Sequence, residues 1–434
     1  MPKLKQFFLG GVFLLIFCCS AAVFCDTASA NDKDEYQNLE IFTDVLSLIR
    51  SSYVEKVDME ELIYGAIRGM LSTLDPHSSF LTPEMYEEMQ AETHGEFGGL
   101  GIEITIKDGN LIIVSPIEDT PADAVGLQAG DQIIKINGKP TRDIEIMEAV
   151  RMMRGPKGEA ITISIQRSGV ADLLDFTIVR DLIQVQSVKS RLLQSHYGYV
   201  RVSQFQDRTG TDLKESLMRL RQESGEQFHG MILDLRNNPG GLLDQAAEVA
   251  DLFLSQGLIV YTEGREPEAQ MKFSARQDGT EPEYPLVVLI NGGSASAAEI
   301  VAGALQDHSR AIILGEQSFG KGSVQTIIPL DDNSGLRLTT ARYFTPSGRS
   351  IQARGISPDI AVSQLKFQRL ENEGPPLREE DLENHFQPST QQQSGEHHNI
   401  SKESVSEEQE DTQLQRAIDL LKGINIHKQY SKAA

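Results

Sequence analysis

The sequence predicts a multi-domain α/β protein, and three observations lead to this fold class. The chain has 434 residues, of which 39% are hydrophobic and 24% are charged, an ordinary globular composition that suffices for about two or three domains. Its apolar residues recur at helical spacing up to about residue 92, and short strands with glycine turns follow up to about residue 180. Strands and helices then alternate up to about residue 365, as in an α/β core.

Residues 1–30 have the pattern of a secretory signal peptide. Lys3 and Lys5 precede an apolar stretch from Phe7 to Phe24, and Ala28-Ser29-Ala30 supplies an A-x-A cleavage site. We therefore expect an exported protein that is periplasmic or otherwise extracytoplasmic. An uncleaved leader that anchors the protein in the membrane is the alternative, because the apolar stretch of 18 residues is near the lower limit for spanning a bilayer.

The cysteines and the net charge exclude several classes of function. All three cysteines, Cys18, Cys19 and Cys25, precede the expected cleavage site, so the mature chain would have no disulfide, thiolate metal site or cysteine nucleophile. The net charge of −23 argues against nucleic acid and against an anionic membrane surface as partners, because both attract an excess of Lys and Arg. Nothing in the sequence calls for a metal or a cofactor.

Residues 31–92 are expected to form a helical N-terminal region. The segment Asp75-Pro76-His77-Ser78 breaks the helical spacing, and Thr82-Pro83 starts a new helix with a cap and a proline at its first position. His77 lies in a turn beside Asp-Pro, so we interpret it as structural rather than catalytic.

Residues 93–180 are expected to form a β-rich domain. Strands are predicted at 101–106, 110–114, 132–136 and 160–166, with one helix at about 144–154. The segment resembles a PDZ domain throughout, and the motifs that carry the resemblance are Phe97-Gly98-Gly99-Leu100-Gly101-Ile102, Ser115-Pro116, Pro121-Ala122, Gly126-Leu127, Gly130-Asp131-Gln132-Ile133 and Ile136-Asn137-Gly138.

The PDZ resemblance implies a peptide-binding site. In such domains a peptide adds as a strand to a sheet edge, and the backbone amides of a glycine-containing loop hold its terminal carboxylate. Here that loop would consist of Gly98, Gly99, Leu100 and Gly101. Arg154 follows the predicted helix, and two interpretations stay open: a pair with an acidic group of a neighbouring domain, or a solvated turn charge.

Residues 181–365 are expected to form an α/β core with a strand-to-helix turn at NGGSASAAEI, residues 291–300. The apolar run at 284–290 suits a strand buried on both faces, and the alanine-rich stretch that starts at Ala297 suits a helix. Ser294 and Ser296 thus lie at a helix N-terminus, where unpaired amides and a partial positive charge favour a developing oxyanion. Taken alone, an N-cap role explains a serine here equally well.

Two residues could serve as the base for such a serine. His308 follows Ser296 by twelve residues, at the end of the same predicted helix. Lys321 lies between two glycines, and it alternates with Ser323 and Gln325 along a predicted strand, so that Lys321 and Gln325 would share a face. A lysine with its usual pKa of about 10.4 acts as a base near neutral pH only when burial lowers that pKa. The amide oxygen of Gln325 could orient the amine without adding charge.

Together, the segments from about Phe42 to Val362 resemble the carboxyl-terminal processing peptidases, which are tail-specific serine proteases. The residues that carry the resemblance are Leu233-Asp234-Leu235-Arg236-Asn237-Asn238-Pro239-Gly240-Gly241, Ser294-Ala295-Ser296-Ala297-Ala298-Glu299-Ile300, Phe319-Gly320-Lys321-Gly322 and Gln325. The resemblance implies a ClpP/crotonase-like protease core with an inserted PDZ-like β-rich domain and a helical N-terminal region. Family members often have Ser-Glu where this chain has Ala298-Glu299.

The same resemblance implies the roles of the site residues. Ser296 would be the nucleophile, Lys321 the base and Gln325 the residue that orients the lysine. The oxyanion donors would be the amide of Ala297 and that of either Gly240 or Gly241. The leading hypothesis is therefore an exported serine endopeptidase that recognises the C-terminal tails of protein substrates through its PDZ domain, without a metal or cofactor.

Two other functions stay open at this point. One is a peptide-binding scaffold that keeps the PDZ fold and has lost catalysis, and the other is a Ser/His hydrolase that uses His308. A regulatory adaptor and a homo-oligomer also stay open as partners.

The C-terminal part is expected to contain a disordered acidic linker at 366–410 and a helix with a tail at 411–434. The linker is rich in Glu, Gln and Ser with few apolar residues. In the last segment Leu414, Ala417, Ile418 and Leu421 recur at helical spacing, which predicts an amphipathic helix that docks on the domain or on a second subunit.

Overall fold

The computed structural model describes residues 36–117, 119–266, 270–277, 279–364 and 411–433. The predicted leader at 1–30 and the predicted linker at 366–410 lie outside these residues. The chain divides into two compact units, Met1–Phe80 and Leu81–Ala434. None of the helices in the described ranges combines the length and the apolar character that a membrane span requires.

The first unit is helical, as predicted. It contains a helix over residues 36–52 and α2 (Met59–Leu71), and the strand β1 (Ser79–Leu81) begins at its end. The carboxylate of Asp58 caps α2 by accepting the amide of Glu60 at 2.8 Å. In the turn after α2, Asp75 accepts the amides of His77 and Ser78 at 2.7 and 2.9 Å, which is the predicted helix break.

The second unit starts with α3 (Pro83–His94), capped by Thr82 and with proline in its first turn as predicted. A sheet of antiparallel pairs follows in the order β3-β4-β5-β7-β8, with β6 pairing β5. These strands are β3 (Ile102–Lys107), β4 (Asn110–Pro116), β5 (Gln132–Ile136), β6 (Lys139–Pro140), β7 (Ala160–Gln166) and β8 (Leu174–Val179). The helices α4 (Pro121–Ala124) and α5 (Ile146–Met153) accompany them. The strands and the helix predicted for this domain are confirmed, whereas α4, β6 and β8 were not predicted.

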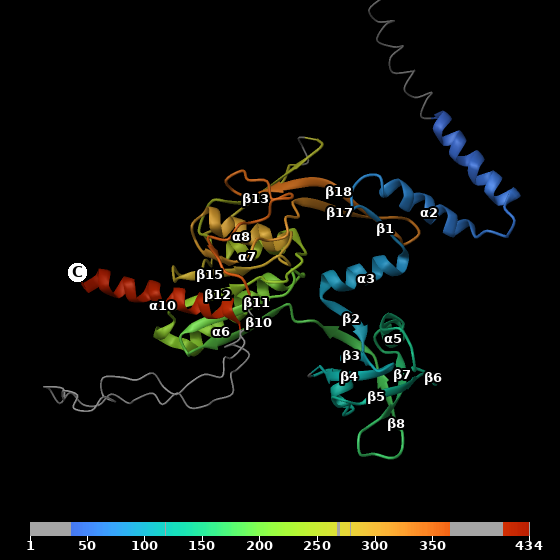
Figure 1. Ribbon diagram of the computed structural model, residues 1–434, viewed down its shortest axis with the longest axis horizontal. Helices are drawn as coiled ribbons and strands as arrows, with labels where there is room; N and C mark the ends of the chain where they lie inside the picture. Colours follow the sequence, from blue (N-terminus) through green and yellow to red (C-terminus); the bar gives the residue numbers. More distant parts are fainter. Residues whose placement is uncertain (1–35, 118, 267–269, 278, 365–410, 434) are drawn as a thin grey trace, which may run out of the picture. The chain divides into compact units, whose positions relative to one another are not determined.

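The α/β core is built on a six-stranded sheet in the order β10-β11-β12-β15-β16-β19 (Figure 1). Its strands are β10 (Val188–Leu193), β11 (Tyr197–Val202), β12 (Gly230–Asp234), β15 (Leu286–Ile290), β16 (Ile312–Gly315) and β19 (Ile360–Ala361). Only β10 runs antiparallel to its neighbour. The connections contain α6 (Thr209–Ser224), the short helix η1 (Gly225–Gln227), α7 (Leu243–Asp251) and α8 (Ala297–Asp307).

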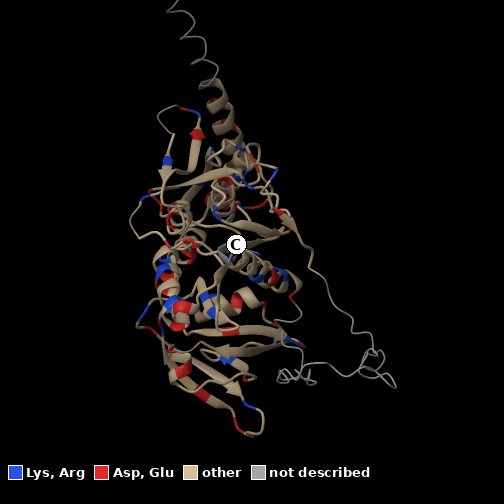
Figure 2. Ribbon diagram, turned by 90° about the vertical axis from the view of Figure 1, so that its left-hand side faces the viewer, with Lys and Arg blue, Asp and Glu red and all other residues tan. Residues whose placement is uncertain are grey.

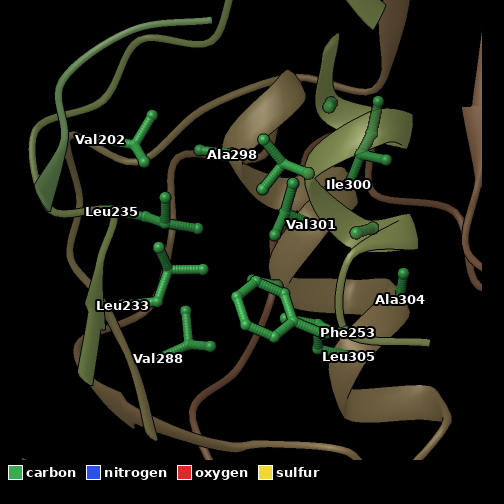
Figure 3. Packing of buried hydrophobic residues seen from close by; sticks show 14 of the residues in the cluster. Val202, Leu233, Leu235, Phe253, Val288, Ala298, Ile300, Val301, Ala304 and Leu305 are labelled. Carbon is green, nitrogen blue, oxygen red and sulfur yellow. The ribbon is translucent and has the colours of Figure 1, made fainter. Parts of the chain in front are cut away.

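Alternate residues of the core strands pack against helices on the two faces of the sheet. On one face, Leu233 of β12 and Val288 of β15 belong to the same buried cluster as Val301 of α8 (Figure 3). On the other face, Ile232 and Val287 belong to the cluster that includes α10 (Thr412–Ala433). The buried residues of α10 include the four that predicted it, Leu414, Ala417, Ile418 and Leu421. The structure thus shows this helix docked on the chain's own sheet.

A second sheet of antiparallel pairs carries part of the candidate site. It contains β13 (Leu258–Gly264), β14 (Lys272–Ser274), β17 (Ser323–Pro329) and β18 (Gly335–Phe344), and β18 lies between β13 and β17. Figure 1 shows β17 and β18 side by side. Acidic and basic residues are interspersed along the described chain, as Figure 2 shows.

Candidate active site

Ser296 lies at the carboxyl edge of the parallel sheet, between β15 and α8. It is the residue before the first turn of α8, and its φ of 55° places it in a region that residues other than glycine seldom adopt. Such conformations persist where the surrounding structure holds them, and they are concentrated at active sites. The side chain is half-buried, so its hydroxyl stays within reach of a substrate.

Ser294 has a structural role. Its side chain is fully buried, its hydroxyl donates to the carbonyl of Leu235 at 2.7 Å, and it accepts the amide of Asn291 at 3.0 Å. These bonds hold the turn after β15 against the segment after β12. Of the two serines in the motif, the geometry therefore favours Ser296 as the nucleophile.

Glu299 joins the serine turn to the lysine segment. One oxygen of its fully buried carboxylate accepts the amides of Ser296 and Lys321 at 2.7 and 2.9 Å. The other oxygen accepts the hydroxyl of Ser318 at 2.6 Å and the amide of Gly320 at 2.7 Å. Burial raises the pKa of Glu299, and these four hydrogen bonds oppose that rise. Sequence reasoning missed this role, although a Glu three residues after a helix-capping Ser is the spacing of a capping box.

Lys321 lies in the segment before β17 and not within the strand, so the prediction that it alternates along a strand with Gln325 was wrong. Its side chain is half-buried, and its pKa is lowered mainly by burial and further by the positive charge of Arg337, while Glu299 acts in the opposite direction. Among the described residues, no hydrogen bond links its Nζ to the Oγ of Ser296.

Tyr343 is a further buried residue at the site, and sequence reasoning missed it. Its hydroxyl donates to the carbonyl of Lys321 and is also paired with the side chain of Ser296. Burial raises the pKa of Tyr343, so the phenol stays protonated. Since this residue lies on β18, nothing local in the sequence connects it with either partner.

Gln325 lies on β17, as predicted, opposite Thr339 of β18. Its amide nitrogen donates to the hydroxyls of Ser323 at 2.9 Å and Thr339 at 3.3 Å. With the nitrogen held by these hydroxyls, the amide oxygen is the end of the side chain that is available to accept a hydrogen bond from a lysine.

Gly240 lies against the serine turn. A Cβ at this position would stand 2.7 Å from the Cβ of Ser296 and 3.1 Å from the amide nitrogen of Ala297, so glycine keeps the space beside that amide open. The amide of Gly240 itself donates to the side chain of Asn238 at 2.9 Å. Within the described part of the chain the amide of Gly241 donates to no protein acceptor, so it is available as a second donor to an oxyanion.

The segment after β12 is tied directly to the serine turn. Asn237 has a φ of 56°, its amide donates to the side chain of Asn291 at 2.8 Å, and the two asparagine side chains are joined by a 2.9 Å hydrogen bond. The amide of Ala295 donates to the carbonyl of Asn238 at 2.9 Å. These bonds set the position of the glycines relative to Ser296.

His308 lies at the opposite end of α8 from Ser296. The helix has 11 residues, which corresponds to a length of roughly 16 Å. The Nε2 of His308 lies 2.7 Å from the carbonyl oxygen of Leu258. The geometry therefore gives no support to a Ser/His pair.

The glycine segment of the PDZ-like domain differs in part from the prediction. Gly98 and Gly99 lie in β2 (Glu96–Gly99), which pairs with β9 (Asp181–Gln184). Of the loop predicted at 98–101, only Leu100 and Gly101 therefore lie outside a strand. Leu100 is buried in the domain core, and Gly101 turns into β3 with a φ of 80°. We attribute the difference to β9, a partner strand that was not predicted.

Of the two interpretations of Arg154, the structure confirms the pair with an acidic residue of a neighbouring region. Its guanidinium pairs with Glu88 of α3 at 3.0 Å and lies over the ring of Phe97 at 4.8 Å from the ring centre. The pair joins the PDZ-like domain to the preceding helix.

Comparison with known proteins identifies the family. Residues 196–362 match the model of peptidase family S41, residues 112–167 match a PDZ domain, and residues 20–85 match the N-terminal domain of the activating protease CtpB. A carboxy-terminal-processing protease from Bartonella bacilliformis is 46% identical over 97% of this chain and 96% of its own length. Carboxy-terminal processing protease CtpB from Bacillus subtilis is 37% identical over 79% of this chain and 71% of its own length.

Solved structures also resemble the chain. The photosystem II D1 C-terminal processing protease is 28% identical and covers 74% of this chain and 92% of its own, with a TM-score of 0.44. The PDZ domain of a carboxy-terminal protease from Vibrio cholerae in complex with a peptide is 27% identical and covers 21% of this chain and 99% of its own, with a TM-score of 0.20. On the family matches and the identity to its relatives, the chain belongs to peptidase family S41 and is a carboxy-terminal processing serine protease with a PDZ domain.

Proposed function

We propose that this protease is an exported endopeptidase whose catalytic groups are Ser296, Lys321 and Gln325. The observation that carries the proposal is the carboxylate of Glu299, because a single oxygen of it binds the amides of both Ser296 and Lys321. The nucleophile and the lysine segment are thereby fixed to one point of the core. The lowered pKa of Lys321 supports its use as a neutral base.

The proposed reaction follows from these groups. The side chain of Ser296, which is paired with Tyr343, turns toward Lys321, and the neutral amine takes the proton from Oγ as it attacks the peptide carbonyl. The amide of Ala297 and an amide of the Gly240–Gly241 turn stabilise the oxyanion. Lys321 returns the proton to the leaving amine, and water then hydrolyses the acyl-enzyme. Gln325 holds the amine toward Ser296 through its amide oxygen.

The presence of a PDZ domain supports the proposal that the enzyme recognises its substrates by their C-terminal tails. Peptides add to such domains as a strand, and backbone amides capture the terminal carboxylate. In this chain, the turn at Leu100 and Gly101 leads directly into β3. Because Gly98 and Gly99 lie in a strand, the backbone amides of Leu100 and Gly101 remain as candidates for binding the terminal carboxylate. The Vibrio cholerae PDZ domain that resembles this one was solved with a peptide bound.

A tailed substrate tests the proposed function. We expect the mature enzyme to cut a protein with an accessible C-terminal tail upstream of that tail, and mass spectrometry of the products maps the cut. The matched control is the same substrate with an amidated C-terminus, which lacks the carboxylate and is expected to be cut less efficiently at low concentration, with a higher KM. Equal efficiency for both substrates would contradict tail recognition.

We further propose that the enzyme acts outside the cytoplasm, on the strength of the leader at 1–30. N-terminal sequencing of the exported protein is expected to return Asn31, because Ala28 and Ala30 fit the small-residue pattern of signal cleavage. An intact N-terminus would show a membrane anchor instead.

A further inference from the structure

Arg236 lies between β12 and the Gly240–Gly241 turn, with a largely buried side chain. It folds back on the fully buried Asp234, which accepts its amide at 3.0 Å, its Nε at 2.9 Å and its Nη2 at 2.7 Å. The hydroxyl of Tyr199 donates to the same carboxylate at 2.8 Å. Four donors on one buried carboxylate fix the backbone at the start of the turn.

The other edge of the guanidinium binds the start of α10. Its Nη1 and Nη2 donate to the two oxygens of Asp411 at 2.8 and 2.7 Å, and Nη1 also donates to the side chain of Gln413 at 3.0 Å. Gln413 is itself buried, and its amide nitrogen donates to the carbonyl of Val362 at 2.7 Å. Asp411 stands 175 positions after Arg236 in the sequence, so the C-terminal segment completes a contact beside the active site.

The backbone that Arg236 holds is the one that faces Ser296. Asn237 follows directly and is bound to Asn291, and the carbonyl of Asn238 accepts the amide of Ala295. The segment at 236–241 is therefore bound on one side by the serine turn and on the other by Asp411 and Gln413. Without Asp411, this edge of a largely buried guanidinium would keep only the side-chain oxygen of Gln413 as a partner and would lose its ion pair, which is costly unless the neighbouring backbone moves.

We propose that Asp411 and Gln413 are positioning residues for peptide hydrolysis. They act through Arg236 to hold the Gly240–Gly241 turn in the position that places its amide beside Ser296. The inference rests on the proposed oxyanion role of that turn. It makes the first residues of the C-terminal segment part of the support of the active site, so that their contact with Arg236 and the rate of turnover are coupled.

Asp411→Asn in the full mature chain is the test, with kcat and KM measured on a peptide substrate. We expect kcat to fall by about 10-fold or more with little change in KM, because the lost interaction aligns groups that act in the transition state. Asp419→Asn is the matched control, since it removes the same charge from an exposed site on the same helix, where Asp419 lies 3.9 Å from Arg416. This control is expected to keep the wild-type kcat.

A second control separates positioning from stability. Leu421 is fully buried under the sheet and lies more than two helical turns beyond Asp411, so Leu421→Ala should lower Tm while kcat stays near wild type well below that temperature. A wild-type kcat for Asp411→Asn would overturn the proposal, as would an equal fall of kcat in Leu421→Ala. If Asp411→Asn does not fold, Gln413→Met decides, because it removes one acceptor and keeps the ion pair, and a fall in kcat is again expected.

Labelling of Ser296 by a fluorophosphonate distinguishes this inference from the proposed function. If the wild type is not labelled at Ser296, the proposed function itself fails. If the wild type is labelled and Asp411→Asn is labelled at the same rate, only the role of Asp411 fails.

Discussion

Ser296→Ala is expected to abolish peptide hydrolysis while the protein still binds C-terminal tails. The substitution removes the attacking oxygen, and the loss of a serine nucleophile lowers kcat on the order of 10⁶-fold in other serine proteases. The PDZ domain does not include this residue, so the affinity for a tail peptide should be unchanged. Turnover and fluorescence titration of a labelled tail peptide measure the two effects separately. Turnover near the wild-type rate would refute the assignment.

Ser294→Ala provides the matched control for that experiment. Ser294 is fully buried, and its hydroxyl donates a hydrogen bond to the carbonyl of Leu235. Because the substitution leaves this carbonyl without that bond, we expect a loss of stability of about 1–3 kcal/mol. At temperatures well below unfolding, a substantial share of the turnover should remain. An inactive but folded Ser294→Ala protein would indicate that the nucleophile is Ser294 and not Ser296.

Lys321→Arg should be nearly as damaging as Lys321→Ala, with a fall in kcat of roughly 10²–10⁴-fold. A guanidinium keeps its proton at any usable pH, so it cannot accept one from Ser296. If the lysine acted only through its positive charge, the arginine protein would keep much of its activity. Initial rates at the wild-type pH optimum measure the effect, with circular dichroism as the control for folding.

The strand, turn and helix around Ser296 could be predicted because each has a local pattern. The apolar run of β15 and the alanine-rich start of α8 determine where the turn lies, and the structure confirms both elements. The pattern could not decide between Ser294 and Ser296 without the family resemblance. The deciding feature is the bond of Ser294 to Leu235, which is 59 positions away in the sequence.

The parts of the site that sequence reasoning missed depend on distant contacts. Tyr343 and the pair of Arg236 with Asp411 come together only through the packing of strands and of α10 on the core, and a single sequence carries no local signal for such pairs. Gly98 and Gly99 were assigned to a loop because the PDZ resemblance implies a glycine-containing, carboxylate-binding loop at these positions. They pair instead with β9, a strand of only four residues.

The rate at which a fluorophosphonate labels Ser296, measured against pH in the wild type and in Lys321→Arg, tests the proposed dyad most directly. Burial and the charge of Arg337 lower the pKa of Lys321, so the fraction of neutral amine grows as the pH rises through that lowered value. We predict a wild-type rate that increases over this range and a Lys321→Arg rate that is much slower at every pH. Equal labelling rates in the two folded proteins would contradict the Ser296/Lys321 dyad.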